Sequence, residues 1–215
     1  IAVPDRDAIA ADMRRVAVAG GDGQVRLVLT GGGRDISVDA PPHTIVLWEP
    51  LPFVPDRMSV VPVVAPWHPA TDVGDFAGVK WTSYAPNMAT TDRARRAGFD
   101  DAILVSTDGI VLEGPTFTCA WVSEGRVETP SLDLGILPSI TRDVVLECCS
   151  RLGIPVDEGR YPLARVTSAD EVWALSTLKQ VVPVERVGES RITGGPIAAR
   201  VAATFVTIVR EETTR

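Results

Sequence analysis

The chain has 215 residues, 45% of them hydrophobic, and a formal net charge of −7, which is enough apolar material for one large or two small domains with a buried core. Its 21 lysine and arginine residues are scattered singly or in pairs, and without a basic stripe we expect no nucleic-acid partner. The apolar runs are shorter than the roughly 20 residues that cross a bilayer and no signal-peptide pattern opens the chain, so we expect a cytoplasmic protein without membrane contact.

Residues 1–66 are predicted to form a small α/β domain. Asp7–Ala19 has the apolar spacing of a helix and is followed by two glycines. Val25–Thr30, Thr44–Trp48 and Met58–Val64 are rich in β-branched residues. We expect these three runs to form one small sheet.

Residues 79–215 are predicted to form a larger domain, separated from the first by a proline- and glycine-rich linker at 67–78. Turn residues at Thr107-Asp108-Gly109 and around Gly125 predict hairpins. In chain order we expect helix Asn87–Ala97, strands Ala102–Ser106, Ile110–Leu112, Phe117–Val122 and Val127–Thr129, helix Ile140–Leu152, strands Glu171–Leu175 and Val181–Val187, and helix Ile197–Val209.

Lys80 is the first candidate for chemistry. It follows the linker, has apolar and aromatic neighbours, and is remote from other lysines in the sequence. A lysine that its surroundings shield from water is a competent amine nucleophile toward an aldehyde. The alternative interpretation is an exposed lysine at the start of a helix.

Glu113 places a carboxylate at the end of an apolar strand, beyond the predicted hairpin. A buried carboxylate is the usual means of keeping the ring nitrogen of a pyridine cofactor protonated. The alternative is a glutamate that faces solvent at a strand end.

Two further segments offer groups for a phosphate. The predicted helix at Ile140–Leu152 begins with Thr141 in its first turn, and the free N–H groups of a helix start bind phosphate. Thr177, between two predicted strands, is a second source of a hydroxyl group. An ordinary capped helix is the alternative for the first segment.

Metal chemistry is not expected. The two histidines lack cysteine or carboxylate partners at metal-ligand spacing. The three cysteines, of which two are adjacent, fit neither a disulfide framework nor a four-ligand zinc site, so we interpret them as reduced core residues.

Five motifs follow one another between Val79 and about Val187, over half of the chain. They are Lys80-x-x-Ser-Tyr-x-x-Asn, Asp108-Gly-x-Val-x-Glu-Gly, Gly125-Arg-Val-x-Thr-Pro, Gly135-Ile-Leu-x-x-Ile-Thr-Arg and Val182-Pro-Val. In this order they resemble the signature of class IV aminotransferases and aminodeoxychorismate lyases.

The resemblance implies an α/β (α+β) protein of fold type IV, with a small α/β domain, a larger domain built on a barrel-like sheet, and pyridoxal 5'-phosphate (PLP) as cofactor. Lys80 would form the Schiff base and move protons, and Glu113 would pair with the pyridine nitrogen. Ile140, Thr141 and Thr177 would hold the phosphate, and Tyr84 would reach the ring oxygen. The resemblance also implies a homodimer and a small-molecule amino substrate.

The chain departs from the family pattern at several points. In branched-chain enzymes the tyrosine comparable to Tyr84 stands one residue later, and Pro115 and Thr118 stand where the family commonly has threonine and asparagine. The first residue is Ile1 rather than methionine, and we expect an N-terminal part of the fold, with a phosphate-binding arginine, to be missing. Arg26 is not expected to replace that arginine.

The turn after Ser176 resembles the Ser-Leu-x-x-Val-x-Pro-Val pattern of the lyases. We therefore favour 4-amino-4-deoxychorismate lyase, which releases 4-aminobenzoate, a folate precursor, and pyruvate. A D-amino-acid or branched-chain aminotransferase is the alternative. A non-catalytic module that keeps the fold is a third hypothesis, of another class.

Overall fold

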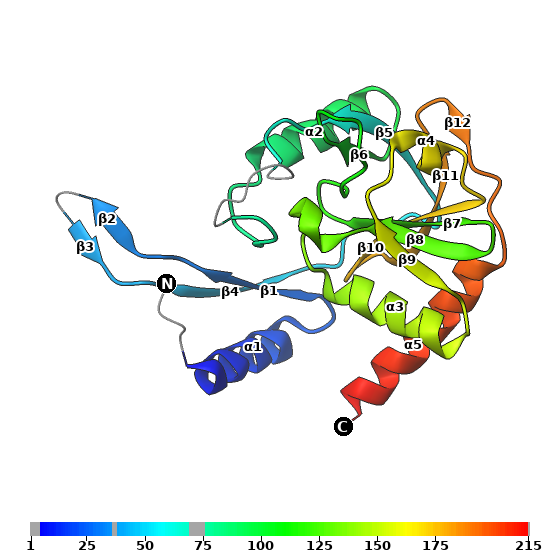
Figure 1. The fold of residues 1–215 in the computed structure, drawn as a ribbon. Helices are drawn as coiled ribbons and strands as arrows, with labels where there is room; N and C mark the ends of the chain where they lie inside the picture. Colours follow the sequence, from blue (N-terminus) through cyan, green and yellow to red (C-terminus); the bar gives the residue numbers. More distant parts are fainter. Residues whose placement is uncertain (1–4, 36–37, 69–75, 215) are drawn as a thin grey trace. The chain divides into compact units, whose positions relative to one another are not determined.

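The computed structural model describes residues 5–35, 38–68 and 76–214 (Figure 1). Its backbone contacts divide the chain into two compact units, Ile1–Phe53 and Val54–Arg215. Part of the linker predicted at 67–78, residues 69–75, lies outside the described residues. Within the described ranges, no helix has the length and apolar character required to span a membrane.

The first unit consists of one helix and two antiparallel pairs of strands. Its elements are α1 (Arg6–Gly20), β1 (Gln24–Leu29), β2 (Gly33–Asp35), β3 (Val38–Ala40) and β4 (Thr44–Glu49), with β1 paired to β4 and β2 to β3. The Asp5 side chain caps α1 by accepting a 2.9 Å hydrogen bond from the Asp7 N–H. This confirms the predicted helix and the first two predicted strands.

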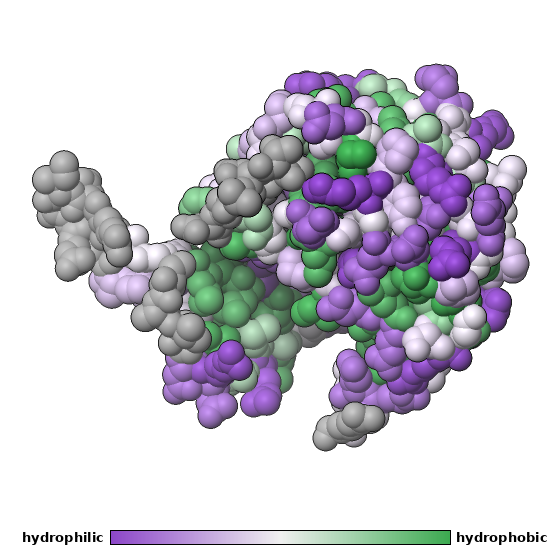
Figure 2. All heavy atoms as spheres, in the orientation of Figure 1, coloured by the Kyte–Doolittle hydropathy of each residue, from purple (hydrophilic) through white to green (hydrophobic). Residues whose placement is uncertain are grey.

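The connection from α1 to β1 is packed against Trp48. A Cβ atom on Gly20 or Gly23 would overlap the indole ring, so both positions require glycine. The indole Nε1 also donates to the Gly21 carbonyl, at 3.3 Å. Apolar side chains nevertheless remain exposed along β1 and β4, and Figure 2 shows an apolar area over this part of the chain.

The second unit is built on one mixed sheet. Its strands are β5 (Met58–Val64), β6 (Asp101–Val105), β7 (Thr118–Ser123), β8 (Arg126–Pro130), β9 (Val156–Gly159), β10 (Glu171–Ser176), β11 (Gln180–Val187) and β12 (Ser190–Arg191). The order across the sheet is β6-β5-β11-β10-β7-β8-β9, with β12 paired to β11. The β11–β5, β5–β6 and β8–β9 pairs are parallel, and the other pairs are antiparallel.

The prediction that Met58–Val64 joins the small sheet of the first domain is wrong. β5 does not pair with β1 or β4; it lies between β11 and β6 in the large sheet. Met58 and Val60 are buried there. Parallel strands are covered on both faces and carry continuous apolar runs, and such a run predicts a strand without indicating which strands lie beside it.

The predicted hairpins are confirmed. Ile110–Leu112 returns alongside β6, with the Leu112 N–H donating to the Leu104 carbonyl at 2.9 Å and the Leu104 N–H to the Glu113 carbonyl at 2.7 Å. Gly109, in the turn, has φ +80°. The sequence did not predict β9 or the short helix α4 (Leu163–Thr167).

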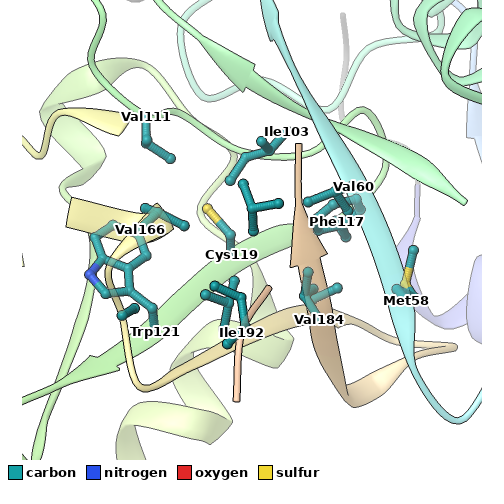
Figure 3. Packing of buried hydrophobic residues seen from close by; sticks show 14 of the residues in the cluster. Met58, Val60, Ile103, Val111, Phe117, Cys119, Trp121, Val166, Val184 and Ile192 are labelled. Atoms are coloured by element: carbon teal, nitrogen blue, oxygen red, sulfur yellow. The ribbon is translucent and has the colours of Figure 1, made fainter. Parts of the chain in front are cut away.

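Helices α3 (Ile140–Arg151) and α5 (Ile197–Thr213) cover one face of the sheet, and α2 (Ala85–Arg96) packs beside β6 (Figure 1). A hydrophobic cluster that includes Trp173, Cys148 and Phe205 lies between the sheet on one side and helices α3 and α5 on the other. A second cluster fills the opposite face, where Cys119 and Trp121 point inward from β7 (Figure 3). Alternate residues of β7 therefore enter different clusters, which explains why this strand is buried along its whole length.

The three cysteines are free and buried, as predicted. Burial raises the pKa of Cys119 to about 12, with a further contribution from the charge of Glu113. It raises the pKa of Cys148 and of Cys149 to about 11. All three thiols therefore stay protonated near neutral pH, and none is activated as a nucleophile.

An ion pair between a buried carboxylate and a partly exposed arginine supports the same sheet. Glu128 on β8 is 3% exposed and accepts hydrogen bonds from Trp121 Nε1 (2.7 Å) and from Arg165 Nε (2.9 Å) and Nη2 (2.7 Å). The Arg165 hydrogen bonds hold the pKa of Glu128 below its usual value of 4.5, assisted by Trp121 and opposed by burial. Because the folded-state pKa is the lower one, this stabilisation is present above about pH 4.5 and is lost as the pH falls through the folded-state value.

We expect Glu128→Gln to lower the free energy of unfolding by about 1.5–3 kcal/mol at pH 7, the range for hydrogen bonds to charged groups. The difference from the native chain shrinks in acid, because the native stabilisation is lost as the pH falls from about 4.5 toward the folded-state pKa of Glu128. Urea unfolding at pH 7 and pH 3 measures both values. Glu147→Gln, which breaks the exposed ion pair with Arg151, is the control, and we expect it to lower the free energy of unfolding by less than about 1 kcal/mol. A loss of stability in Glu128→Gln that does not change with pH would contradict the assignment.

Candidate functional site

The segment that leads into Lys80 lies against the segment that leads into α3. The Gly78 N–H donates to the Gly135 carbonyl at 3.0 Å. Gly78 has φ +69°, and a Cβ atom there would lie 3.4 Å from both the Ile136 carbonyl oxygen and Pro138 Cδ. Two segments almost sixty residues apart in the sequence are thus joined two residues before Lys80.

Lys80 itself is exposed. Its Nζ donates to the Tyr84 hydroxyl at 3.2 Å and lies 5.3 Å from the centre of the tyrosine ring. The expectation that the amine is shielded from water is therefore wrong for this structure. The neighbouring Val79 and Trp81 side chains are exposed as well and do not cover the amine. Apolar neighbours in the sequence do not bury a side chain unless a second segment covers them.

Glu113 contacts the same segment before α3. Its side chain is 15% exposed, so the alternative of a solvent-facing glutamate is not supported. Oε2 accepts a 3.2 Å hydrogen bond from the Leu137 N–H, and Oε1 lies 3.0 Å from His68 Nε2. Glu113 and the Gly78–Lys80 segment are therefore both attached to residues 135–138.

The first turn of α3 is fixed by two side chains. Ser139 is the N-cap, and its Oγ accepts from the Arg142 N–H at 3.3 Å. The Arg142 side chain is buried, donates to the Pro130 carbonyl at 3.3 Å and forms an ion pair with Glu158. The N–H groups of Ile140 and Thr141, at the first two positions of α3, have no partner within the helix and remain available to an anion.

Thr177 lies in the turn between β10 and β11 and is exposed. The Ser176 Oγ accepts from the Lys179 N–H at 3.2 Å and closes this turn. Lys179 Nζ lies 5.4 Å from the centre of the Phe117 ring, four residues after Glu113. No hydrogen bond in the described part of the chain joins Thr177 to Lys80, Glu113 or the start of α3.

The Ser139 cap provides a stability test of the α3 start. We expect Ser139→Ala to lower the free energy of unfolding by about 1 kcal/mol, because the first turn loses its side-chain acceptor. Ser131→Ala is the matched control, since Ser131 stands before a short 3-10 helix, Leu132–Leu134, without a capping hydrogen bond from its side chain. Urea unfolding of both variants measures the difference; equal effects would show that the Ser139 hydroxyl does not cap α3.

The donor set fits a PLP molecule. An ionised carboxylate has about four lone-pair positions, and Glu113 uses one on each oxygen within the described residues. The start of α3 supplies N–H groups for a phosphate, and Lys80 supplies a primary amine. Within the described ranges no three His, Cys, Asp or Glu side chains are grouped to hold a metal ion.

Sequence reasoning missed His68 as part of this arrangement. In the sequence, His68 was a candidate only for metal binding. In the structure its partner is Glu113, 45 residues further along the chain. The motifs also did not reveal Trp67, whose Nε1 donates to Asn87 Oδ1 at 3.0 Å. No local pattern marks either contact, because each joins residues from separate elements.

The model of the family described as amino-transferase class IV matches residues 2–187, and the chain belongs to this family. A probable branched-chain-amino-acid aminotransferase from Thermotoga maritima is 38% identical over 117 residues, covering 52% of this chain and 43% of the relative. An aminodeoxychorismate lyase from Bacillus subtilis is 33% identical over 89 residues, covering 41% of this chain and 30% of the relative. The matched parts are less than half of the length of these two relatives.

A PLP-bound structure of a hypothetical aminotransferase from Mycobacterium tuberculosis superposes with a TM-score of 0.83 at 26% identity, covering 97% of this chain and 78% of that one. The similar solved structures include fold IV transaminases, which confirms the expected fold. Class IV aminotransferases are PLP-dependent enzymes, so the cofactor expectation is also confirmed at the level of the family.

Proposed function

We propose that the chain carries the PLP site of a class IV enzyme and that Lys80 binds the cofactor covalently through its amine. Glu113 pairs with the ring nitrogen in this proposal. Further groups for the phosphate and the ring oxygen come from Ile140, Thr141, Thr177 and Tyr84. The observation that carries the proposal is the attachment of both Glu113 and the Gly78–Lys80 segment to residues 135–138, directly before the α3 start.

The charges of these groups suit the two ends of the cofactor. The α3 N–H groups and the positive end of the helix dipole stabilise a phosphate. The Glu113 carboxylate stabilises a protonated ring nitrogen, and when bound, PLP supplies an electron sink for the substrate carbon. Displacement of the lysine nitrogen from the cofactor by the substrate amine would free the Lys80 amine. That amine would then accept a proton from the substrate carbon and return it, as a general base and then a general acid.

For the reaction, we propose 4-amino-4-deoxychorismate lyase. Two observations support this reaction. The segment from Ser176 to Val184 resembles the lyase pattern, and the chain is similar to the Bacillus subtilis lyase. The second candidate is a branched-chain aminotransferase, which the similarity to the Thermotoga maritima relative favours. Both reactions use the same lysine, carboxylate and helix start.

Covalent labelling tests the site. The chain contains two lysines, Lys80 and Lys179, so a modified side-chain amine can be assigned without ambiguity. We expect incubation with PLP, reduction with borohydride and peptide mass spectrometry to find the cofactor adduct on Lys80. A chain without an adduct there would leave the non-catalytic module as the better hypothesis, and an adduct on Lys179 would overturn the assignment of the lysine.

Product analysis separates the two reactions. A lyase releases pyruvate from aminodeoxychorismate without an added amino acceptor. A transaminase instead requires a 2-oxo acid to complete its cycle. Pyruvate formation in the absence of any 2-oxo acid supports the lyase, and turnover of branched-chain amino acids only with a 2-oxo acid supports the aminotransferase.

A further inference from the structure

His68 is a buried histidine that none of the roles above uses. It lies in the turn after β5, where the Ala65 N–H donates to Val105 and the His68 N–H donates to Ala65, at 2.9 and 3.0 Å. Its side chain is 6% exposed. Its Nε2 lies 3.0 Å from Oε1 of Glu113, so the ring is directed at the carboxylate that the proposed site assigns to the cofactor nitrogen.

The chemistry of the pair fixes which nitrogen carries the hydrogen. An ionised carboxylate only accepts hydrogen bonds, so His68 Nε2 is the donor. The other ring nitrogen, Nδ1, is buried and has no hydrogen-bond partner among the described residues. A hydrogen on Nδ1 would therefore have no acceptor among these residues, which favours the placement of a ring hydrogen on Nε2.

A second pair of hydrogen bonds holds the same turn. Trp67 Nε1 donates to Asn87 Oδ1, and Asn87 Nδ2 donates to the Pro115 carbonyl, each at 3.0 Å. Asn87 belongs to α2, which begins five residues after Lys80. The turn is thus bound to Glu113 and to the helix that follows Lys80, and Asn87 of that helix is bound in turn to Pro115, two residues after Glu113.

The two donors to Glu113 restrict its rotation. His68 contacts one oxygen and the Leu137 N–H contacts the other. A carboxylate held at both oxygens directs its remaining lone pairs in a fixed direction. Fixed acceptors bind a ligand with a smaller loss of side-chain entropy than freely rotating ones.

We propose that His68 is a positioning residue that orients Glu113 toward the ring nitrogen of the cofactor. It acts on the cofactor only through the carboxylate. The proposal rests on the proposed function, because it takes Glu113 as the partner of that nitrogen.

The first test uses the full chain without cofactor. The protein has two histidines, and the other one, His43, is exposed, so ¹⁵N-labelled histidine gives two sets of ring signals that His43→Gln assigns. We expect His68 to show the Nε2–H form in the native chain and to change its ring nitrogen shifts in Glu113→Gln, while His43 stays unchanged. Identical His68 signals in both proteins would overturn the proposal.

The second test measures PLP affinity and the visible spectrum of the bound cofactor. His68→Phe keeps a ring but removes the hydrogen-bond donor. We expect this variant to bind PLP about tenfold more weakly and to show an altered absorption band. The magnitude is taken from metal sites, where loss of a residue that supports a ligand lowers affinity about 10- to 100-fold. His68→Gln, whose amide nitrogen reaches the Nε2 position, restores affinity to within about threefold of the native value. His43→Phe is the matched control and leaves affinity and spectrum unchanged.

The outcomes separate this proposal from the proposed function. A native chain with an adduct on Lys80, together with a His68→Phe variant of native affinity and spectrum, overturns the role of His68 alone. A native chain that takes no adduct on Lys80 overturns the proposed function, and the role of His68 with it. If His68→Phe does not fold, the nitrogen shifts and the His68→Gln spectrum decide, and a His68→Gln spectrum unlike the native one counts against the proposal.

Discussion

We expect Lys80→Met to lower kcat for the proposed release of pyruvate from aminodeoxychorismate by about 1000-fold or more. The proposed function assigns Lys80 two roles that this variant removes together, the covalent attachment of the cofactor and the transfer of a proton at the substrate carbon. General acid and base groups alone contribute about 10²- to 10⁴-fold, and losing an amine nucleophile adds to that. The fold should persist, because the Lys80 side chain is exposed and its hydrogen bond to Tyr84 is at the surface.

Lys179→Met is the matched control, since it removes the only other lysine. Burial lowers the pKa of Lys179, so its amine is easier to deprotonate than an ordinary lysine amine. Its Nζ, however, lies over the Phe117 ring, whereas the segment before Lys80 is hydrogen-bonded to Gly135. Steady-state kinetics and circular dichroism of both variants make the comparison; a large loss of kcat in Lys179→Met with native activity in Lys80→Met would reverse the assignment.

Replacing Glu113 with alanine will lower both activity and stability. We expect kcat to fall by about 100-fold or more, because the proposed function assigns Glu113 the task of keeping the ring nitrogen protonated. We also expect the free energy of unfolding to fall by about 1–3 kcal/mol for each donor left without an acceptor. Those donors are His68 Nε2 and the Leu137 N–H.

Glu113→Gln separates the two effects. The amide keeps the size of the side chain and one acceptor oxygen but carries no charge, so stability recovers in part while kcat stays low. Glu147→Ala, in an exposed pair with Arg151, is the control for loss of a carboxylate at the surface. Urea unfolding and initial-rate kinetics measure the two properties, and native activity in Glu113→Ala would exclude a role for this carboxylate at the ring.

Most helices and strands could be predicted because their signals are local. Asp5 and the glycines after α1 mark its ends, and Gly109 and Gly125 mark hairpin turns at which positive φ is observed. The order of the family motifs is likewise a property of the sequence alone. It was sufficient to identify the family before any contact was known.

The partners of these elements could not be predicted in the same way. The apolar run of β5 fits any buried strand position, and only the pairing with β11 and β6 placed it in the large sheet. β9 was missed because its residues are half exposed and it is held by pairing with β8 rather than by a hydrophobic pattern. Strand pairing depends on residues distant in the sequence, about which periodicity carries no information.

The family and the residue types of the candidate site follow from motifs along the amino-acid sequence. The contacts of Glu113 with His68 and Leu137, the hydrogen bond from Gly78 to Gly135 and the exposure of the Lys80 side chain are known only from the folded chain. The physical reason is that motifs depend on spacing along the chain. Burial and hydrogen-bond partners depend instead on which distant segments fold against one another.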